Sequence, residues 1–149
     1  MGYAGADNGW YDLNTMSSDE QVIPHRNTGD WQLDFARLHL HQWLPTDGIV
    51  GNTWNWLYNA IFSANLAIEQ LENAKAAPAK IAEAKVLRAF FYYLLMDDFG
   101  NVPFFTQNNV TVDKIPQISR KELYDFVVKE LTENLDKLPT TKGGEFYGR

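Results

Sequence analysis

Residues 83–106 constrain the fold of this 149-residue chain more than any other segment, and they read EAKVLRAFFYYLLMDDFGNVPFFT. The segment begins as a helix with charged residues and becomes apolar on nearly every side between Ala89 and Met96. Such a helix packs between other helices or lies in a membrane, and this apolar stretch is shorter than the roughly 20 residues that a bilayer requires. We therefore expect a helix that ends near Gly100 and lies inside a helical stack. The residues expected in the middle of the stack are Phe90, Phe91, Tyr92, Tyr93, Leu94 and Leu95.

Long helices are also predicted on either side of this one along the chain, which makes the fold class all-α. Residues 52–74 carry apolar side chains at spacings of three and four, residues 79–98 form the helix above, and residues 119–138 form the next. Ser119 and Glu122 have the spacing of a capping box, in which each side chain satisfies a backbone N–H at the helix start. The expected buried stripe of the first helix is Trp54, Leu57, Tyr58, Ile61, Ala64, Ile68 and Leu71. The expected buried stripe of the last helix is Leu123, Val127, Leu131, Leu135 and Leu138.

The rest of the chain is predicted to be mostly irregular. Residues 1–51 contain several glycines and prolines, and the segment 3–31 shows no periodicity. Residues 32–44 fit a strand with alternating apolar side chains and a short helix almost equally well. Residues 99–118 are expected to be a loop with extended pieces, and residues 119–149 comprise the last long helix and a polar, glycine-rich end.

Composition narrows the function classes. The chain is 45% hydrophobic and 14% aromatic, which is too apolar for an intrinsically disordered protein. Its net charge of −6 argues against nucleic acid and against adhesion to anionic membranes, since both require basic patches. It has no cysteine, so it has neither a disulfide nor a thiolate metal site.

Two tryptophans, Trp10 and Trp31, lie in aperiodic segments among glycine, asparagine and aspartate. A flat ring can stack on the apolar face of a sugar, and flanking polar groups can bond its hydroxyls. We therefore predict that these rings, with polar neighbours such as Asp30 and with Tyr11, form part of a carbohydrate surface. The alternative is that the rings pack the loops against the helices.

No pattern in the sequence indicates catalysis, a cofactor or a metal. His39 and His41 could share a face on a strand, but no third ligand is obvious. The neighbouring carboxylates Asp97 and Asp98 point about 100° apart on a helix, so they do not form the facing pair of a glycoside hydrolase. Phosphate-binding, zinc-protease and nucleophile-elbow motifs are absent. We predict a protein that is not an enzyme.

Arg88 lies within the apolar helix, where a buried guanidinium requires a partner. We expect a structural ion pair with Glu83, with Asp97 or with another acid on an adjacent helix.

The order of motifs along nearly the whole chain resembles the SusD/RagB family, whose members are glycan-binding lipoproteins on the outer membrane of Bacteroidetes bacteria. The run EAKVLRAFFYYLLMDDFGNVPFFT is similar to the signature helix and exit loop of that family. Further segments that resemble the family, in its order, are Tyr3-Ala4-Gly5, Ser18-Asp19-Glu20, Trp56-Leu57-Tyr58 with Ile61 and Asn65, Arg120 through Pro139, and Tyr147-Gly148-Arg149.

The resemblance implies tetratricopeptide-like stacked helix pairs with long irregular loops, of which residues 1–149 would be the N-terminal part. It implies capture of an oligosaccharide on the extracellular face of the outer membrane and delivery to a SusC-like TonB-dependent transporter. Attachment to the membrane would use a lipid anchor whose cysteine is absent from this chain. The family builds part of its ligand surface at the position of residues 24–27. The resulting ligand-binding candidates are Trp10, Tyr11, His25, Arg26, Asn27, Asp30 and Trp31.

A helical-repeat adaptor that binds a protein or peptide is the alternative function. The location of exposed aromatic side chains distinguishes the two hypotheses. A cluster in irregular loops favours sugar, and a stripe along a helix face favours a peptide.

Overall fold

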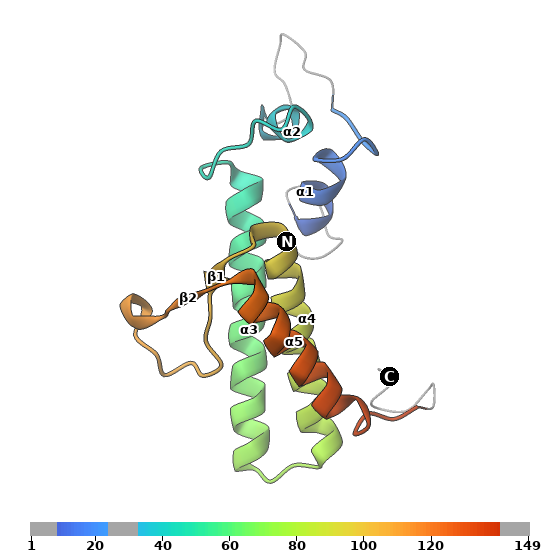
Figure 1. The fold of residues 1–149 in the computed structure, drawn as a ribbon, viewed down its shortest axis with the longest axis vertical. Helices are drawn as coiled ribbons and strands as arrows, with labels where there is room; N and C mark the ends of the chain where they lie inside the picture. Colours follow the sequence, from blue (N-terminus) through green and yellow to red (C-terminus); the bar gives the residue numbers. More distant parts are fainter. Residues whose placement is uncertain (1–8, 24–32, 141–149) are drawn as a thin grey trace. The chain divides into compact units, whose positions relative to one another are not determined.

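The computed structural model describes residues 9–23 and 33–140 (Figure 1). In this part of the chain the regular secondary structure is helical except for one pair of two-residue strands, which confirms the predicted all-α class. The elements are α1 (Trp10–Met16), α2 (Leu33–His39), α3 (Gly48–Asn73), α4 (Pro78–Phe99), β1 (Val102–Pro103), the 3-10 helix η1 (Val112–Lys114), β2 (Gln117–Ile118) and α5 (Arg120–Leu135). They fall into two compact units, Met1–Trp56 and Leu57–Arg149. Within the described residues, no helix is both long and apolar enough to cross a bilayer.

The helical unit, Leu57–Arg149, contains the three long helices that the sequence predicts. From Leu57 onward α3 runs antiparallel to α4, and α5 packs on α4 (Figure 1). Gly100 ends α4 with a φ of +72°, a backbone angle that glycine adopts at little cost. The predicted capping box begins α5, because Ser119 N donates to Glu122 Oε2 at 2.8 Å and Glu122 N donates to Ser119 Oγ at 3.2 Å.

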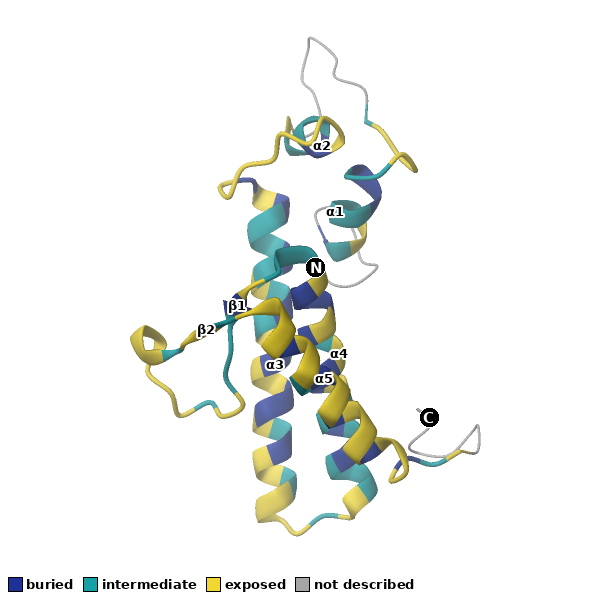
Figure 2. Cartoon of the chain, in the orientation of Figure 1, coloured by how far each residue is buried: buried dark blue, intermediate teal, exposed yellow. Residues whose placement is uncertain are grey.

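The core of the helical unit lies along the faces that these three helices turn toward one another (Figure 2). Leu57 and Ile61 of α3 face it, as do Tyr92 and Leu95 of α4 and Leu123 of α5. Each fully buried side chain of this size contributes roughly 1.5–3 kcal/mol of hydrophobic free energy relative to exposure. Packing, rather than helix propensity, therefore holds the unit together.

Helix α4 is not buried on every side, so part of the sequence prediction is wrong. Tyr92, Leu94 and Leu95 are buried as expected, whereas Phe91 is half-buried and Phe90 and Tyr93 are exposed. The physical reason is geometric. Helices α3 and α5 cover two sides of α4, and a third side of the helix faces away from both within the described residues.

The buried stripe of α5 also differs from the predicted one. Leu123, Val127 and Leu138 are buried, but Leu131 and Leu135 are exposed, and Glu130 and Asn134 take the buried positions. Both sets have helical spacing, so periodicity alone could not separate them. The preference for Glu130 has an electrostatic cause, because Glu130 pairs with the buried Arg88 of α4.

The N-terminal unit, Met1–Trp56, has a small core of its own, formed by Met16, Phe35, Leu38 and Ile49. This packing explains one difference from the sequence prediction and decides one open alternative. Residues 10–16 form α1 where an irregular segment was expected, and of the strand and short helix that both fit residues 32–44, Leu33–His39 form the helix. Both helices have seven residues and are too short to be stable by propensity alone, so tertiary contacts decide their conformation.

Charged side chains connect α2 to the start of α3 within the N-terminal unit. Arg37 pairs with Asp34 at 2.8 Å and with Asp47, whose side chain is nearly inaccessible. Asp47 Oδ2 also accepts from Leu44 N at 2.9 Å, and Asp34 Oδ2 accepts from Gly48 N at 2.7 Å. The Arg37 hydrogen bond holds the pKa of Asp47 below its ordinary value, with a further lowering by the Leu44 N–H.

A polar pocket in the helical unit as the candidate functional site

Two tyrosine hydroxyls fix the extended segment that follows α4. Tyr58 of α3 donates to the Pro103 carbonyl at 2.7 Å. Tyr92 of α4 donates to the Phe105 carbonyl at 2.6 Å and accepts from Phe105 N at 3.1 Å. Burial raises the pKa of both hydroxyls above the ordinary tyrosine value, so both keep the proton that they donate. The segment is thus held against α3 and α4 at fixed points.

Aromatic packing reinforces this attachment. The rings of Tyr92, Phe104 and Phe126 form a cluster with centroid distances of 4.7–5.7 Å, and the 71° angle between Phe104 and Phe126 is an edge-to-face contact. Tyr58 stacks on Phe105 with centroids 6.0 Å apart. Strand β1 also pairs with β2, which joins the start of the segment to the start of α5.

Arg88 of α4 connects three parts of the helical unit. It is 6% exposed and donates from Nε to Glu130 Oε2 of α5 at 3.1 Å and from Nη2 to Glu130 Oε1. Its Nη1 donates to Asn65 Oδ1 of α3 at 2.8 Å and to the Thr106 carbonyl at 3.2 Å. The prediction of a structural ion pair with an acid on an adjacent helix is confirmed. The partner is Glu130 rather than Glu83 or Asp97.

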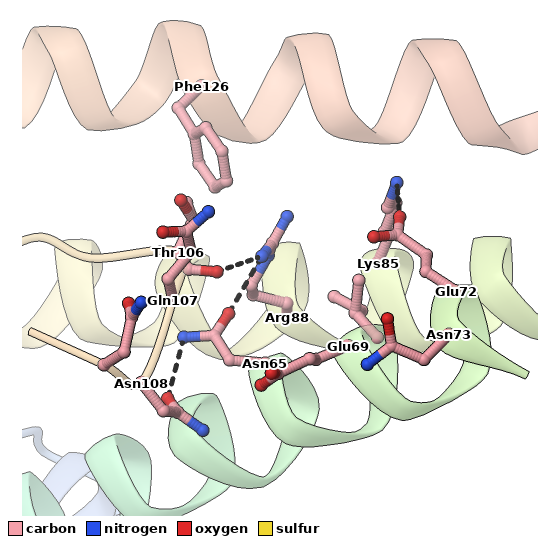
Figure 3. A pocket seen from close by; sticks show the side chains of 12 residues that line it. Asn65, Glu69, Glu72, Asn73, Lys85, Arg88, Thr106, Gln107, Asn108 and Phe126 are labelled. Atoms are coloured by element: carbon pink, nitrogen blue, oxygen red, sulfur yellow. Dashed lines mark hydrogen bonds and ion pairs between the residues drawn. The ribbon is translucent and has the colours of Figure 1, made fainter.

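Beside Arg88 lies a pocket of about 470 Å³, within the range of small-molecule sites (Figure 3). Helix α3 contributes one wall through residues on a single face, α4 and the segment after it form the other walls, and Phe126 of α5 lies above, as Figure 3 shows. The lining residues are Asn65, Ile68, Glu69, Glu72, Asn73, Lys85, Arg88, Thr106, Gln107, Asn108, Asn109 and Phe126.

The polar groups of the pocket divide into fixed and available ones. The amide of Asn65 is held by Arg88, and Asn108 Nδ2 donates to the Phe62 carbonyl at 2.8 Å. Among the described residues, no hydrogen bond or ion pair is made by four further side chains of the pocket: Glu69, Asn73, Gln107 and Asn109. Three amides and one carboxylate can therefore bond a ligand without breaking an internal contact.

Two of the ligand-binding residues predicted from the sequence lie in the part of the chain that the structure describes, and neither of them lines this pocket. Trp10 and Tyr11 open α1 in the N-terminal unit, in a helix rather than in the expected irregular loop, with Trp10 half-buried and Tyr11 50% exposed. The other candidates lie outside the described residues, and their roles stay predictions: His25, Arg26, Asn27, Asp30 and Trp31.

Sequence reasoning missed the pocket residues, although two signals were present. Asn65, Glu69 and Asn73 are four residues apart along α3, which places a polar stripe beside its apolar one. The run 107–109 reads Gln-Asn-Asn directly after the signature segment. Neither signal shows by itself that the two stretches face a common cavity.

Comparisons with known proteins identify the family of the chain. The sequence profile of the SusD-like family described as "Starch-binding associating with outer membrane" matches residues 3–146. SusD-like protein P38 of Formosa agariphila is 37% identical over 84 residues, which is 54% of this chain and 17% of that protein.

Solved structures agree on the fold. A SusD homolog from Bacteroides thetaiotaomicron has a TM-score of 0.67 and 28% identity over 78% of this chain and 24% of its own. A protein crystallised with xylogluco-oligosaccharide has a TM-score of 0.72 and 21% identity over 89% of this chain and 28% of its own. The chain thus spans between 17% and 28% of the lengths of these relatives. These likenesses confirm the predicted tetratricopeptide-like fold class. The chain belongs to the SusD-like family.

Proposed function

We propose that this chain is part of a protein that binds an oligosaccharide nutrient without altering it covalently. One observation carries the proposal: a chain of the SusD-like family contains a ligand-sized polar pocket with amides and a carboxylate that have no internal partner. Sugars present many hydroxyls, each a donor and an acceptor. An amide side chain offers both roles, so Asn73, Gln107 and Asn109 match that chemistry.

The surroundings of the pocket favour a preformed site. The Arg88–Glu130 pair and Asn65 hold α3, α4 and α5 together on its inner side. Phe126 lies beside it and offers an apolar ring to the C–H face of a sugar. A site that is rigid before binding loses less conformational entropy when the ligand arrives.

The N-terminal unit is proposed to carry ligand-binding residues of its own. Its residues are those that the sequence indicates: Trp10, Tyr11, His25, Arg26, Asn27, Asp30 and Trp31. The half-exposed ring of Tyr11 is available for stacking. The relative crystallised with xylogluco-oligosaccharide supports an oligosaccharide as the class of ligand.

The proposal also includes delivery of the bound ligand to a transporter. The whole protein would lie on the extracellular face of the outer membrane, held by a lipid anchor, and would pass its ligand to a SusC-like TonB-dependent transporter. The description of the family, which includes association with the outer membrane, supports that membrane as the location.

Calorimetric titration of the chain with a panel of neutral oligosaccharides tests ligand binding. We expect weak binding of at least one oligosaccharide, with Asn73→Ala and Gln107→Ala each weakening it several-fold because each removes about one net hydrogen bond. Gln117→Ala is a suitable control, since Gln117 is an exposed amide that lies outside the pocket. Binding that is equally strong in all three variants would remove the pocket from the proposed site.

One observation favours the alternative, binding of a peptide at a helix face. Most exposed aromatic rings of the described residues lie on the long helices, namely Phe62, Phe90, Tyr93 and Tyr124, whereas Tyr11 lies on the short α1 and Trp43 in a loop. Peptide selection by phage display tests this function. Enriched peptides that lose binding to Phe90→Ser but keep it to Asn73→Ala would favour the alternative over glycan capture.

A further inference from the structure

Four charged side chains line the pocket, and three of them are neutralised. Lys85 Nζ contacts Glu72 Oε1 at 2.9 Å, and Arg88 is paired with the buried Glu130. Glu69 is the fourth, and it makes no ion pair within the described part of the chain. The pocket therefore carries one uncompensated negative charge.

We infer that Glu69 is a specificity-determining residue, which makes the pocket accept neutral or amino sugars and reject sugar acids and sulfated sugars. This inference rests on the proposed function and names the ligand class of the same site. A carboxylate accepts hydrogen bonds from two neighbouring hydroxyls and pairs with an ammonium group. It repels a uronate or a sulfate ester, because like charges placed together weaken an interface.

The cations of the pocket cannot offset this repulsion without a cost. Arg88 already donates to Glu130, Asn65 and the Thr106 carbonyl. A ligand carboxylate that took Arg88 would leave Glu130, 7% exposed, as a buried charge without a partner. Lys85 is more accessible, but a ligand that took it would release Glu72 as a second negative charge beside Glu69.

The effect is local rather than a result of the overall charge. The chain carries a net charge of −6, but a carboxylate such as Asp113 on η1 lies outside the pocket that Glu69 lines. Interactions beyond about 8 Å are largely screened at physiological ionic strength. Removing Glu69 should thus change charge selectivity, and removing a distant surface carboxylate should not.

The test uses one neutral oligosaccharide and the same oligosaccharide oxidised at C6 to the uronic acid, so that the two ligands differ only at C6, where one carries a negative charge. Calorimetry with the whole 149-residue chain measures both dissociation constants. We expect the oxidised form to bind at least about tenfold more weakly, a difference of about 1.4 kcal/mol. Glu69→Gln should reduce that ratio to about threefold or less, and the reduction should be larger at low salt.

Asp113→Asn is the matched control, because it removes one negative charge from exposed η1, outside the pocket. It should leave the ratio of dissociation constants unchanged. Equal binding of the two ligands by the unmodified chain, or a ratio that Glu69→Gln does not change, would overturn the inference while leaving glycan binding intact. Failure of both ligands and of the whole neutral panel to bind would contradict the proposed function and this inference together.

Discussion

Arg88 and Glu130 are 42 positions apart in the sequence and form a buried, bidentate ion pair between α4 and α5. Forked pairs of this kind have a fixed geometry, since two parallel N–H groups must meet two carboxylate oxygens. The pair thereby sets the rotation of α5 about its own axis. This accounts for the burial of Glu130 and the exposure of Leu131.

Removing one member of this pair should destabilise the chain strongly. Glu130→Ala should lower the free energy of unfolding by about 3–5 kcal/mol, because it leaves the Arg88 guanidinium buried without a counter-charge. Urea denaturation followed by circular dichroism measures the change. Glu133→Ala, on the exposed side of α5, is the control and should cost less than about 0.5 kcal/mol. A loss below about 1 kcal/mol for Glu130→Ala would show that the pair is accessible to water.

The Tyr92 hydroxyl should stabilise the segment that follows α4. Tyr92→Phe leaves both backbone groups of Phe105 without this partner, which should cost about 1–3 kcal/mol. Hydrogen exchange at the Phe105 amide should accelerate more than the global change in stability explains. The same substitution at exposed Tyr93 should leave that amide unchanged.

Two leucines of α4 provide a matched test of the packing. Leu95 is fully buried, whereas Leu87 is 47% exposed. Leu95→Ala should cost about 2–5 kcal/mol through lost contacts and a cavity. Leu87→Ala should cost less than about 1 kcal/mol, and Phe91→Ala should fall between the two because Phe91 is half-buried. A larger drop in the denaturant midpoint for Leu87→Ala than for Leu95→Ala would refute this packing.

The N-terminal unit should lose stability in acid through Asp47. Arg37 and the Leu44 N–H hold the pKa of Asp47 below the ordinary value of 3.8. A carboxyl whose pKa is lowered on folding stabilises the fold above its unfolded pKa, and this contribution disappears as the pH falls through the folded pKa. The melting temperature of the chain should therefore exceed that of Asp47→Asn at neutral pH, and the gap should shrink below about pH 4. A difference in melting temperature that does not change with pH would show that the ionised Arg37–Asp47 pair is not its cause.

Trp31 should contribute to binding rather than to stability. Trp31→Ala should weaken oligosaccharide binding roughly tenfold, since stacking and associated hydrogen bonds are each worth about 1 kcal/mol. Paired titration and melting curves separate the two roles. A lower melting temperature with unchanged affinity would identify Trp31 as a packing residue.

The sequence alone was sufficient for features with local causes. Residues 52–74, 79–98 and 119–138 were predicted as helices, and they correspond to α3, α4 and α5 with end differences of one to four residues. The Ser119–Glu122 capping box and the end of α4 at Gly100 depend on neighbours within four positions. Such features depend only on residue spacing and backbone preference over a few neighbouring positions, so they can be predicted from the sequence.

Short helices were harder to predict than long ones. Helices α1 and α2 have seven residues each, and their conformation depends on a core to which Ile49, far along the chain, contributes. Isolated segments of this length have no stable conformation in water, so no local pattern could decide between helix, strand and loop.

The sequence by itself determined the family, the helical class and the requirement that Arg88 have an acidic partner. Only the tertiary structure decided that the partner is Glu130, which side of α5 is buried, and that Glu69, Asn73 and Gln107 line one pocket. The physical reason is that these relationships join positions tens of residues apart. Helical periodicity shows which residues share a face, but the packing of α3, α4 and α5 determines what that face meets.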